Sequence, residues 1–165
     1  MREIAAVILA AGQGTRLKSA LPKVLHAVGG MPMVSWSVQS ARALGADPIV
    51  LVVGYGADQV RQAVGEIALY AEQAQRLGTG HATLQAKPLL QGQTRSVVVL
   101  YGDMPTLRAE TLQRLVALHR AKQPAVTKDG LHMVVSGNLE FQNEVKTAHA
   151  HGAEGIGLYR TEFLY

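Results

Sequence analysis

A glycine-rich stretch near the N-terminus holds the residues best suited to binding a phosphorylated ligand. It reads Leu-Ala-Ala-Gly-Gln-Gly-Thr-Arg over residues 9–16, and a Pro-Lys pair follows shortly after it. Glycines in a loop leave no Cβ atoms between the backbone N–H groups and a ligand, so phosphate oxygens can approach closely. Arg16 and Lys23 place two positive charges beside this loop. The alternative is an ordinary turn between a strand and a helix, in which Gly12 and Gly14 serve only backbone geometry.

A carboxylate stands at a second position suited to ligand binding. Asp103 comes directly after the apolar run 96–101 and one glycine. Open α/β sheets bind their ligands at the carboxyl ends of the strands, which is where this side chain is expected. A lone aspartate after a strand is often a turn or cap residue, but the apolar run directly before it favours the ligand-binding interpretation.

Strand-like apolar runs alternate with helix-like segments, which is the pattern of a parallel sheet covered by helices on both faces. The first run, residues 5–9, shows no polar alternation, so we expect a strand buried on both faces. Further strands are expected at residues 48–54, 67–72, 96–101, 131–136 and 155–163. Helices are expected at residues 33–44, 57–64, 78–90, 108–121 and 140–151. We therefore expect a three-layer α/β/α Rossmann-like domain with a mostly parallel sheet of about six strands.

The composition is that of a globular protein. The 165 residues are enough for one domain with a sizeable core, and 48% of them are hydrophobic against 17% charged. The net charge of +4 is scattered and only 5% of residues are aromatic, so we expect a small anionic ligand and neither nucleic acid nor a membrane surface. The absence of cysteine excludes disulfides, and the N-terminus leads straight into the first strand without room for a signal peptide. We therefore expect a cytoplasmic protein.

The glycine-rich stretch, together with Leu-Pro-Lys-Val-Leu at residues 21–25, resembles the sugar-phosphate nucleotidyltransferases. Within them it is similar to the pyrophosphorylase domain of bacterial bifunctional N-acetylglucosamine-1-phosphate uridyltransferases, and the resemblance covers residues 1–122. It implies attack by a sugar 1-phosphate oxygen on the α-phosphorus of UTP, with release of pyrophosphate. Such a transfer depends mainly on positioning and on stabilisation of charge.

The resemblance also implies a role for individual residues. Arg16 and Lys23 would contact the phosphates as catalytic groups, and Asp103 would bind Mg²⁺. Gln73 would read the edge of uracil, because an amide supplies both a donor and an acceptor; without the resemblance it would be a solvent-facing residue at a strand end. Further nucleotide contacts would come from Leu9, Ala10, Ala11, Gly12, Gly14, Gly78 and Thr79. As plain sequence, Gly78-Thr79 is equally well the N-cap of a helix.

Three other chemically versatile side chains are given no ligand role. His81, at the start of an expected helix, is interpreted as structural. His149 and His151 are two residues apart and do not share a helix face, so they are not expected to form a metal site.

The C-terminal part resembles a different family. Residues 152–164 read Gly-Ala-Glu-Gly-Ile-Gly-Leu-Tyr-Arg-Thr-Glu-Phe-Leu, similar to a barrel strand of phosphoenolpyruvate-utilising enzymes such as enzyme I of the phosphotransferase system. The arginine of that motif, here Arg160, binds the phosphate of phosphoenolpyruvate in that family, but its other barrel strands are not in this chain. This predicts a chimera, natural or engineered, with one domain over residues 1–165. Its nucleotidyltransferase-like segment would be residues 1–122 and its barrel-derived β-α-β segment residues 123–165.

Three interpretations of function follow from the two resemblances. The first is a truncated and fused nucleotidyltransferase-like domain that binds Mg²⁺ and UTP or another nucleotide. Its catalysis would be weak or absent, because the sugar-binding residues and an asparagine metal ligand of that family lie in the replaced segment. Asn138 belongs to the other motif and is not assigned that role. The second is a recombined or engineered scaffold without activity. The third is a phosphate or phosphoenolpyruvate binder acting through Arg160. An apolar strand at the C-terminus also predicts a possible homo-oligomer.

Overall fold

The computed structural model describes residues 2–14, 17–75, 77–121, 125–126, 132–133, 136–139 and 155–159. The chain divides into two compact units, Met1–Gln113 and Arg114–Tyr165. Each unit is described by itself.

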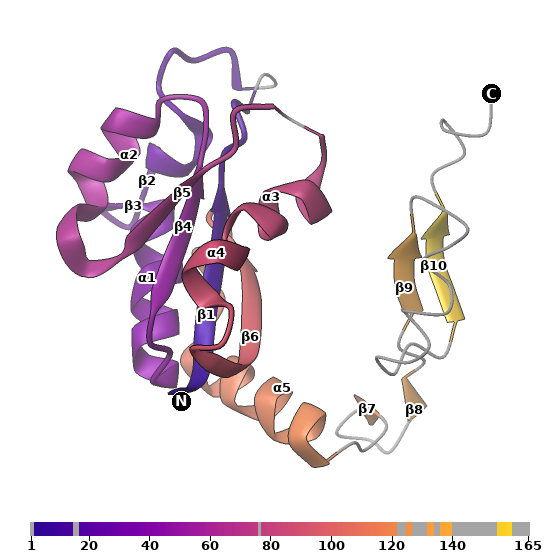
Figure 1. The fold of residues 1–165 in the computed structure, drawn as a ribbon. Coiled ribbons are helices and arrows are strands. Elements are labelled where there is room, and N and C mark those ends of the chain that lie inside the picture. Colours follow the sequence, from indigo (N-terminus) through magenta and orange to yellow (C-terminus); the bar gives the residue numbers. More distant parts are fainter. Residues whose placement is uncertain are drawn as a thin grey trace. The chain divides into compact units, whose positions relative to one another are not determined.

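The first unit is built on a four-stranded parallel sheet in the order β5-β4-β1-β6 (Figure 1). Its strands are β1 (Arg2–Ala10), β4 (Ile49–Val53), β5 (Leu69–Glu72) and β6 (Thr94–Tyr101). All five side chains of β4 are buried, as expected for a central parallel strand that reads as a continuous apolar run. Because β4 and β6 lie on opposite sides of β1, the strand order reverses at β1, and such reversals are where open α/β sheets bind ligands.

Helices cover both faces of this sheet (Figure 1). The main helices are α1 (Met33–Leu44), α2 (Ala57–Val64), α3 (Thr79–Gln85), α4 (Lys87–Leu90) and α5 (Ala109–Ala121). From α3 and α4, Ala82 and Leu90 pack in one core cluster with Val7 and Val52 of the sheet. On the other face α1 buries Val34, Val38 and Ala41. The three-layer α/β/α fold with a mostly parallel sheet is therefore confirmed.

The segment between β1 and α1 is longer than an ordinary strand-to-helix turn. It contains the 3₁₀ helix η2 (Lys23–Leu25) and a short antiparallel pair, β2 (Ala27–Val28) and β3 (Met31–Pro32). The next 3₁₀ helix, η3 (Gly65–Ile67), directly precedes β5. The prediction that residue 67 opens a strand was wrong, since the strand begins at residue 69.

The predicted helix over residues 78–90 is two helices. Ala86 lies between them, as the C-cap of α3 and the N-cap of α4. Pro88 lies in the first turn of α4, the position where a residue without an N–H group is tolerated. Within the described part of the chain, every helix is too short or too polar to cross a membrane.

The second unit contains short strands that pair among themselves. An antiparallel pair is formed by β7 (Ala125–Val126) and β8 (His132–Met133), and a parallel pair by β9 (Ser136–Leu139) and β10 (Gly155–Tyr159). A parallel pair needs a crossover connection. The helix predicted at residues 140–151 lies outside the described residues. Among the described residues the main sheet has four strands, so the prediction of about six strands in one sheet was wrong.

Candidate functional site

The residues predicted to bind a ligand gather at the carboxyl end of the main sheet. Ala11 follows β1, Gln73 follows β5, and Asp103 follows β6 by one glycine. The parallel registers align these ends. Leu9 of β1 pairs with Tyr101 of β6, and beside β4 the backbone N–H of Gln73 donates to the Val53 carbonyl, 2.8 Å away. Neighbouring strands are about 4.8 Å apart, so the edge from β5 to β6 spans about 14 Å. An extended ligand can therefore contact both ends of this edge.

Lys23 and Asp103 are brought together from positions 80 residues apart. The Lys23 ammonium donates to Asp103 Oδ2 as a hydrogen-bonded ion pair. Their side chains are 42% and 28% exposed, so solvent screens the pair and it contributes little to stability. The same exposure leaves both groups accessible, the ammonium to a phosphate oxygen and the carboxylate to a cation.

Lys23 is held in place by its apolar neighbours in the chain. Pro22 and Val24, on either side of it, are both buried. The 3₁₀ turn between them is closed by a hydrogen bond of 2.9 Å from the Leu25 N–H to the Pro22 carbonyl. The ammonium therefore extends from a fixed backbone toward the carboxyl end of β6.

The two glycines of the loop after β1 differ in their surroundings. Gly14 has a φ of +69°, and a Cβ there would lie 2.5 Å from the Cβ of Lys23, so both the backbone conformation and the space require glycine. A Cβ on Gly12 would meet no atom within 4 Å, and Gly12 is exposed. Protein packing therefore explains Gly14 but gives no reason for Gly12.

Gln73, Gly78 and His81 form a second group at the β5 end of the edge. The Gln73 side chain is nearly buried, at 6% exposure. Its Nε2 donates to the Gly78 carbonyl at 3.0 Å and lies 3.1 Å from Nδ1 of His81. Gly78 is the N-cap of α3, and Thr79, its first residue, is exposed. The side-chain hydrogen bond thus closes the loop between β5 and α3.

His81, a member of this group, and Gln85, its neighbour on α3, were not expected to be part of a site. His81 was interpreted only as a structural residue, and Gln85 was not singled out. Nε2 of Gln85 lies 3.1 Å from Nε2 of His81 and donates to the His81 carbonyl at 3.0 Å. The i, i+4 spacing of these two polar residues on one helix is the signal that predicts their contact.

Two described carboxylates stand at the strand ends of this edge: Asp103, ion-paired with Lys23 after β6, and Glu72, ion-paired with Arg61 at the end of β5. No group of three or more His, Asp or Glu side chains that could hold a metal ion occurs within the described ranges. Magnesium is commonly held by one or two carboxylates, with water and substrate phosphates completing its shell. Asp103 therefore fits a metal that arrives with a phosphorylated ligand. Arg16, Arg160, His149 and His151 lie outside the described residues.

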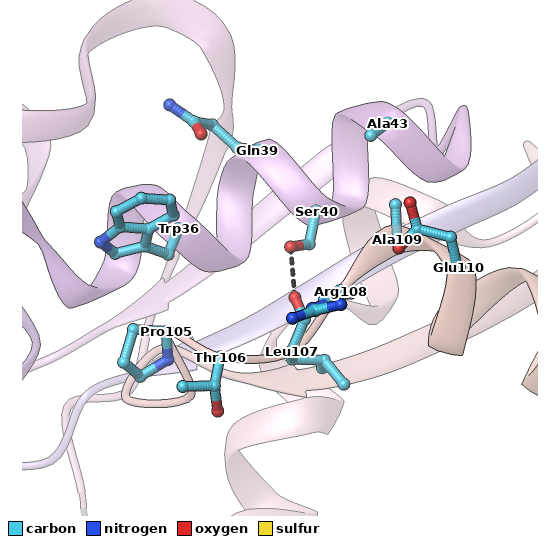
Figure 2. A pocket seen from close by; sticks show the side chains of 10 residues that line it. All are labelled: Trp36, Gln39, Ser40, Ala43, Pro105, Thr106, Leu107, Arg108, Ala109 and Glu110. Atoms are coloured by element: carbon cyan, nitrogen blue, oxygen red, sulfur yellow. Dashed lines mark hydrogen bonds between the residues drawn. The ribbon is translucent and has the colours of Figure 1, made fainter. Parts of the chain in front are cut away.

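A separate hollow of about 470 Å³ lies between α1 and the loop that leads from β6 to α5 (Figure 2). Trp36 and Ser40 line it from α1, and the Ser40 hydroxyl donates to the Leu107 carbonyl at 2.6 Å. None of the predicted ligand-binding residues lines this hollow. It is therefore distinct from the edge that carries Lys23 and Asp103.

Comparison with known proteins identifies similar sequences. Residues 6–154 match the family described as the MobA-like NTP transferase domain. The bifunctional protein GlmU of Pelobacter propionicus is 52% identical over 130 residues, which are 77% of this chain and 28% of that protein. GlmU of Pelotomaculum thermopropionicum is 53% identical over 125 residues, 76% of this chain and 27% of that protein. The chain thus spans a little over a quarter of the length of these curated relatives.

Two solved structures have a similar fold. A nucleotidyl transferase from Methanothermobacter thermautotroptrophicus superposes with a TM-score of 0.63 at 22% identity, covering 71% of this chain and 58% of that one. Rv0371C from Mycobacterium tuberculosis H37Rv, in complex with manganese, gives a TM-score of 0.63 at 20% identity and covers 96% of this chain and 88% of that one. These likenesses support the fold.

Proposed function

Because the chain belongs to the family of MobA-like NTP transferase domains, we propose that the carboxyl edge of its main sheet binds UTP. The observation that carries the proposal is the accessible Lys23–Asp103 pair beside the open position at Gly12. A cation, a carboxylate and an unobstructed backbone at one edge suit the triphosphate of a nucleotide and its counter-ion.

The two ends of the edge suit the two ends of a nucleotide. Lys23, with Arg16, would contact the phosphates, and backbone groups of residues 9–14 would approach them closely. Gln73 and Gly78 would contact the base about 14 Å away, at the end of β5. The resemblance of the glycine-rich stretch to the uridyltransferases favours UTP as the nucleotide. The GlmU relatives are about half identical to this chain over three quarters of its length.

Asp103 would hold Mg²⁺ together with the phosphates of the nucleotide. The ion would supply positive charge that stabilises the phosphate oxygens. A manganese complex of a protein with the same fold supports the use of a divalent cation. With one carboxylate beside Lys23 at the phosphate end, residues 1–122 are expected to bind the nucleotide better than they organise an in-line transfer, so we propose weak or absent catalysis.

The change of ancestry near residue 123 is part of the same proposal. Alignments with GlmU relatives span 122–130 residues, close to the 122 residues of the predicted N-terminal segment, whereas the family match extends to residue 154. The nucleotide site proposed here lies wholly within residues 1–122. It is therefore independent of the origin of the C-terminal segment.

The decisive experiment is a calorimetric titration of the full chain with UTP in the presence of Mg²⁺. Saturable binding is expected, weakened at least about tenfold in Lys23→Ala and Gln73→Ala, because each loses a direct contact. Lys87→Ala, which removes an exposed lysine from α4, is the matched control and should bind normally. No binding by the intact chain would favour an inactive scaffold.

Two further experiments, an activity assay and a binding titration, separate the remaining interpretations. Release of pyrophosphate from UTP and N-acetylglucosamine 1-phosphate measures whether any transfer occurs. Binding of phosphoenolpyruvate that Arg160→Ala abolishes, with no binding of UTP, would support the third interpretation and contradict the proposal.

A further inference from the structure

We propose that His81 is a positioning residue that holds the Gln73 carboxamide in one orientation and thereby sets which base the site accepts. This inference rests on the proposed function, because it concerns the base end of the same site. It gives a role to a histidine that the sequence alone indicated to be structural.

The hydrogen bond to the Gly78 carbonyl identifies which atom of the Gln73 amide is the nitrogen. A carbonyl oxygen can only accept, so the atom 3.0 Å from it must be the amide nitrogen, Nε2. The same nitrogen lies 3.1 Å from Nδ1 of His81. Its second hydrogen is therefore directed at the ring, and Nδ1 has to accept it.

Gln85 competes with Gln73 for the acceptor nitrogen of the His81 ring. Its Nε2 also faces the ring, at 3.1 Å from Nε2 of His81, and is oriented by its hydrogen bond to the His81 carbonyl. A neutral imidazole has one acceptor nitrogen, so the ring cannot accept from both amides. An unmet donor costs more at the buried Gln73 than at the half-buried Gln85. The proton of His81 therefore belongs on Nε2, and the ring accepts from Gln73.

Gln73 can therefore hydrogen-bond to a ligand only through its side-chain oxygen. Both hydrogens of Nε2 are committed, one to Gly78 and one to His81, so only Oε1 remains to pair with a base. The N3–H group of uracil is a donor that suits this oxygen. Cytosine has a lone pair at N3, which the oxygen repels, and it could donate to the oxygen only from its 4-amino group, one ring position away. The expected recognition by both a donor and an acceptor thus reduces to recognition by an acceptor that His81 holds in place.

The test compares UTP with CTP in variants of His81, in the full chain with Mg²⁺. His81→Ala and His81→Gln remove an acceptor at the Nδ1 position and should lower the ratio of CTP to UTP dissociation constants about tenfold, the effect of about one hydrogen bond. His81→Asn, whose Oδ1 lies near the former Nδ1, should retain the ratio. Thr83→Ala, which removes a hydroxyl bonded to the Thr79 carbonyl on the same helix, is the matched control.

A measurement without ligand separates this inference from the proposed function. Long-range ¹H–¹⁵N spectra of the ligand-free chain should show His81 with a bare Nδ1 and a protonated Nε2. The side-chain amide protons of Gln73 should exchange faster with water in His81→Ala than in His81→Asn. A proton on Nδ1, or an unchanged nucleotide ratio in His81→Ala, would overturn the positioning role. Failure of the intact chain to bind UTP would overturn the proposed function, and the spectra alone would then decide whether His81 holds Gln73.

Discussion

Gly12 and Gly14 lie two residues apart in one loop, yet the structure constrains them differently. Gly14 has a left-handed backbone, and Lys23 packs where its Cβ would be, whereas Gly12 faces open space. A glycine that the fold itself does not require is best explained by the close approach of a ligand. The loop thus combines a structural glycine with a proposed ligand-binding one.

Alanine substitution should separate these two roles. Gly14→Ala should lower the free energy of unfolding by about 1 kcal/mol or more, because it strains a positive φ and displaces Lys23. Gly12→Ala should leave stability within about 0.5 kcal/mol and weaken UTP binding at least about tenfold. Urea unfolding and calorimetry measure the two effects. Equal losses of stability in both variants would contradict this division.

The Lys23–Asp103 pair should matter for ligand binding and little for folding. Because both side chains are partly exposed, a double-mutant cycle with alanine should give a coupling free energy below about 1 kcal/mol in thermal or urea unfolding. Asp103→Asn should instead remove most of the dependence of UTP affinity on Mg²⁺. Titrations with Mg²⁺ and with EDTA measure that dependence, and an unchanged response to EDTA would exclude Asp103 as the metal ligand.

At the scale of elements, helix α1 is tied to the end of strand β6 from which Asp103 follows. Ser37 is completely buried, and its hydroxyl donates to the Tyr101 carbonyl at 2.9 Å. This bond joins the layer of α1 to the carboxyl edge of the sheet. The position of Asp103 therefore depends on packing outside its own loop.

Ser37→Ala should lower the free energy of unfolding by about 1 kcal/mol, the usual contribution of one such hydrogen bond. It should also weaken UTP binding, because the end of β6 loses a constraint. Ser35→Ala, on the same helix but only half-buried, is the control in both assays. A Ser37→Ala variant with wild-type stability would show that the bond does not hold the two layers together.

Tyr70 links β5 to the end of α2 and gives the fold a pH dependence. Its hydroxyl donates to the Gly65 carbonyl at 2.6 Å, and burial raises the pKa of Tyr70 above its ordinary value of 10.0, an effect that Arg61 partly offsets. The unfolded chain therefore ionises first, so the free energy of unfolding should fall as the pH rises above 10. In unfolding experiments between about pH 9 and about pH 11, Tyr70→Phe should remove this part of the pH dependence of the free energy of unfolding.

At the scale of the whole molecule, strand β6 exposes an apolar stripe. Val97, Val99 and Tyr101 alternate along the strand and are 44%, 43% and 48% exposed. Within the described sheet, β6 pairs on one side only, with β1. An apolar strand at a sheet edge is a common site of self-association, and this stripe adds to the association proposed for the C-terminal strand.

We therefore expect the chain to self-associate at high concentration. Val99→Lys should reduce the association, because it places a charge in the middle of the stripe. Lys87→Ala is again a control without effect on this face. Light scattering coupled to size-exclusion chromatography gives the mass, and a strict monomer at high concentration would contradict the prediction.

Local patterns in the sequence were enough to predict the α/β class, the four main strands and the edge at which the candidate residues gather. Apolar runs such as residues 49–53 predict buried parallel strands, and parallel strands put their carboxyl ends at one edge. Boundaries were less well predicted: the helix expected over residues 78–90 divides at Ala86, although Pro88, two residues later, is a local signal for such a break. The pairing of β9 with β10, and not with the main sheet, depended on contacts between distant segments.

The sequence by itself determined which residues have the chemistry for a nucleotide site, since glycines, a lysine, a glutamine and an aspartate follow strands at recognisable spacings. Only the tertiary structure decided how they act together. It paired Lys23 with Asp103 across 80 residues and placed His81 against Gln73. It also showed that packing requires a glycine at position 14 but not at position 12. The physical reason is that side-chain partners depend on strand register and helix packing, which join segments that no local pattern relates.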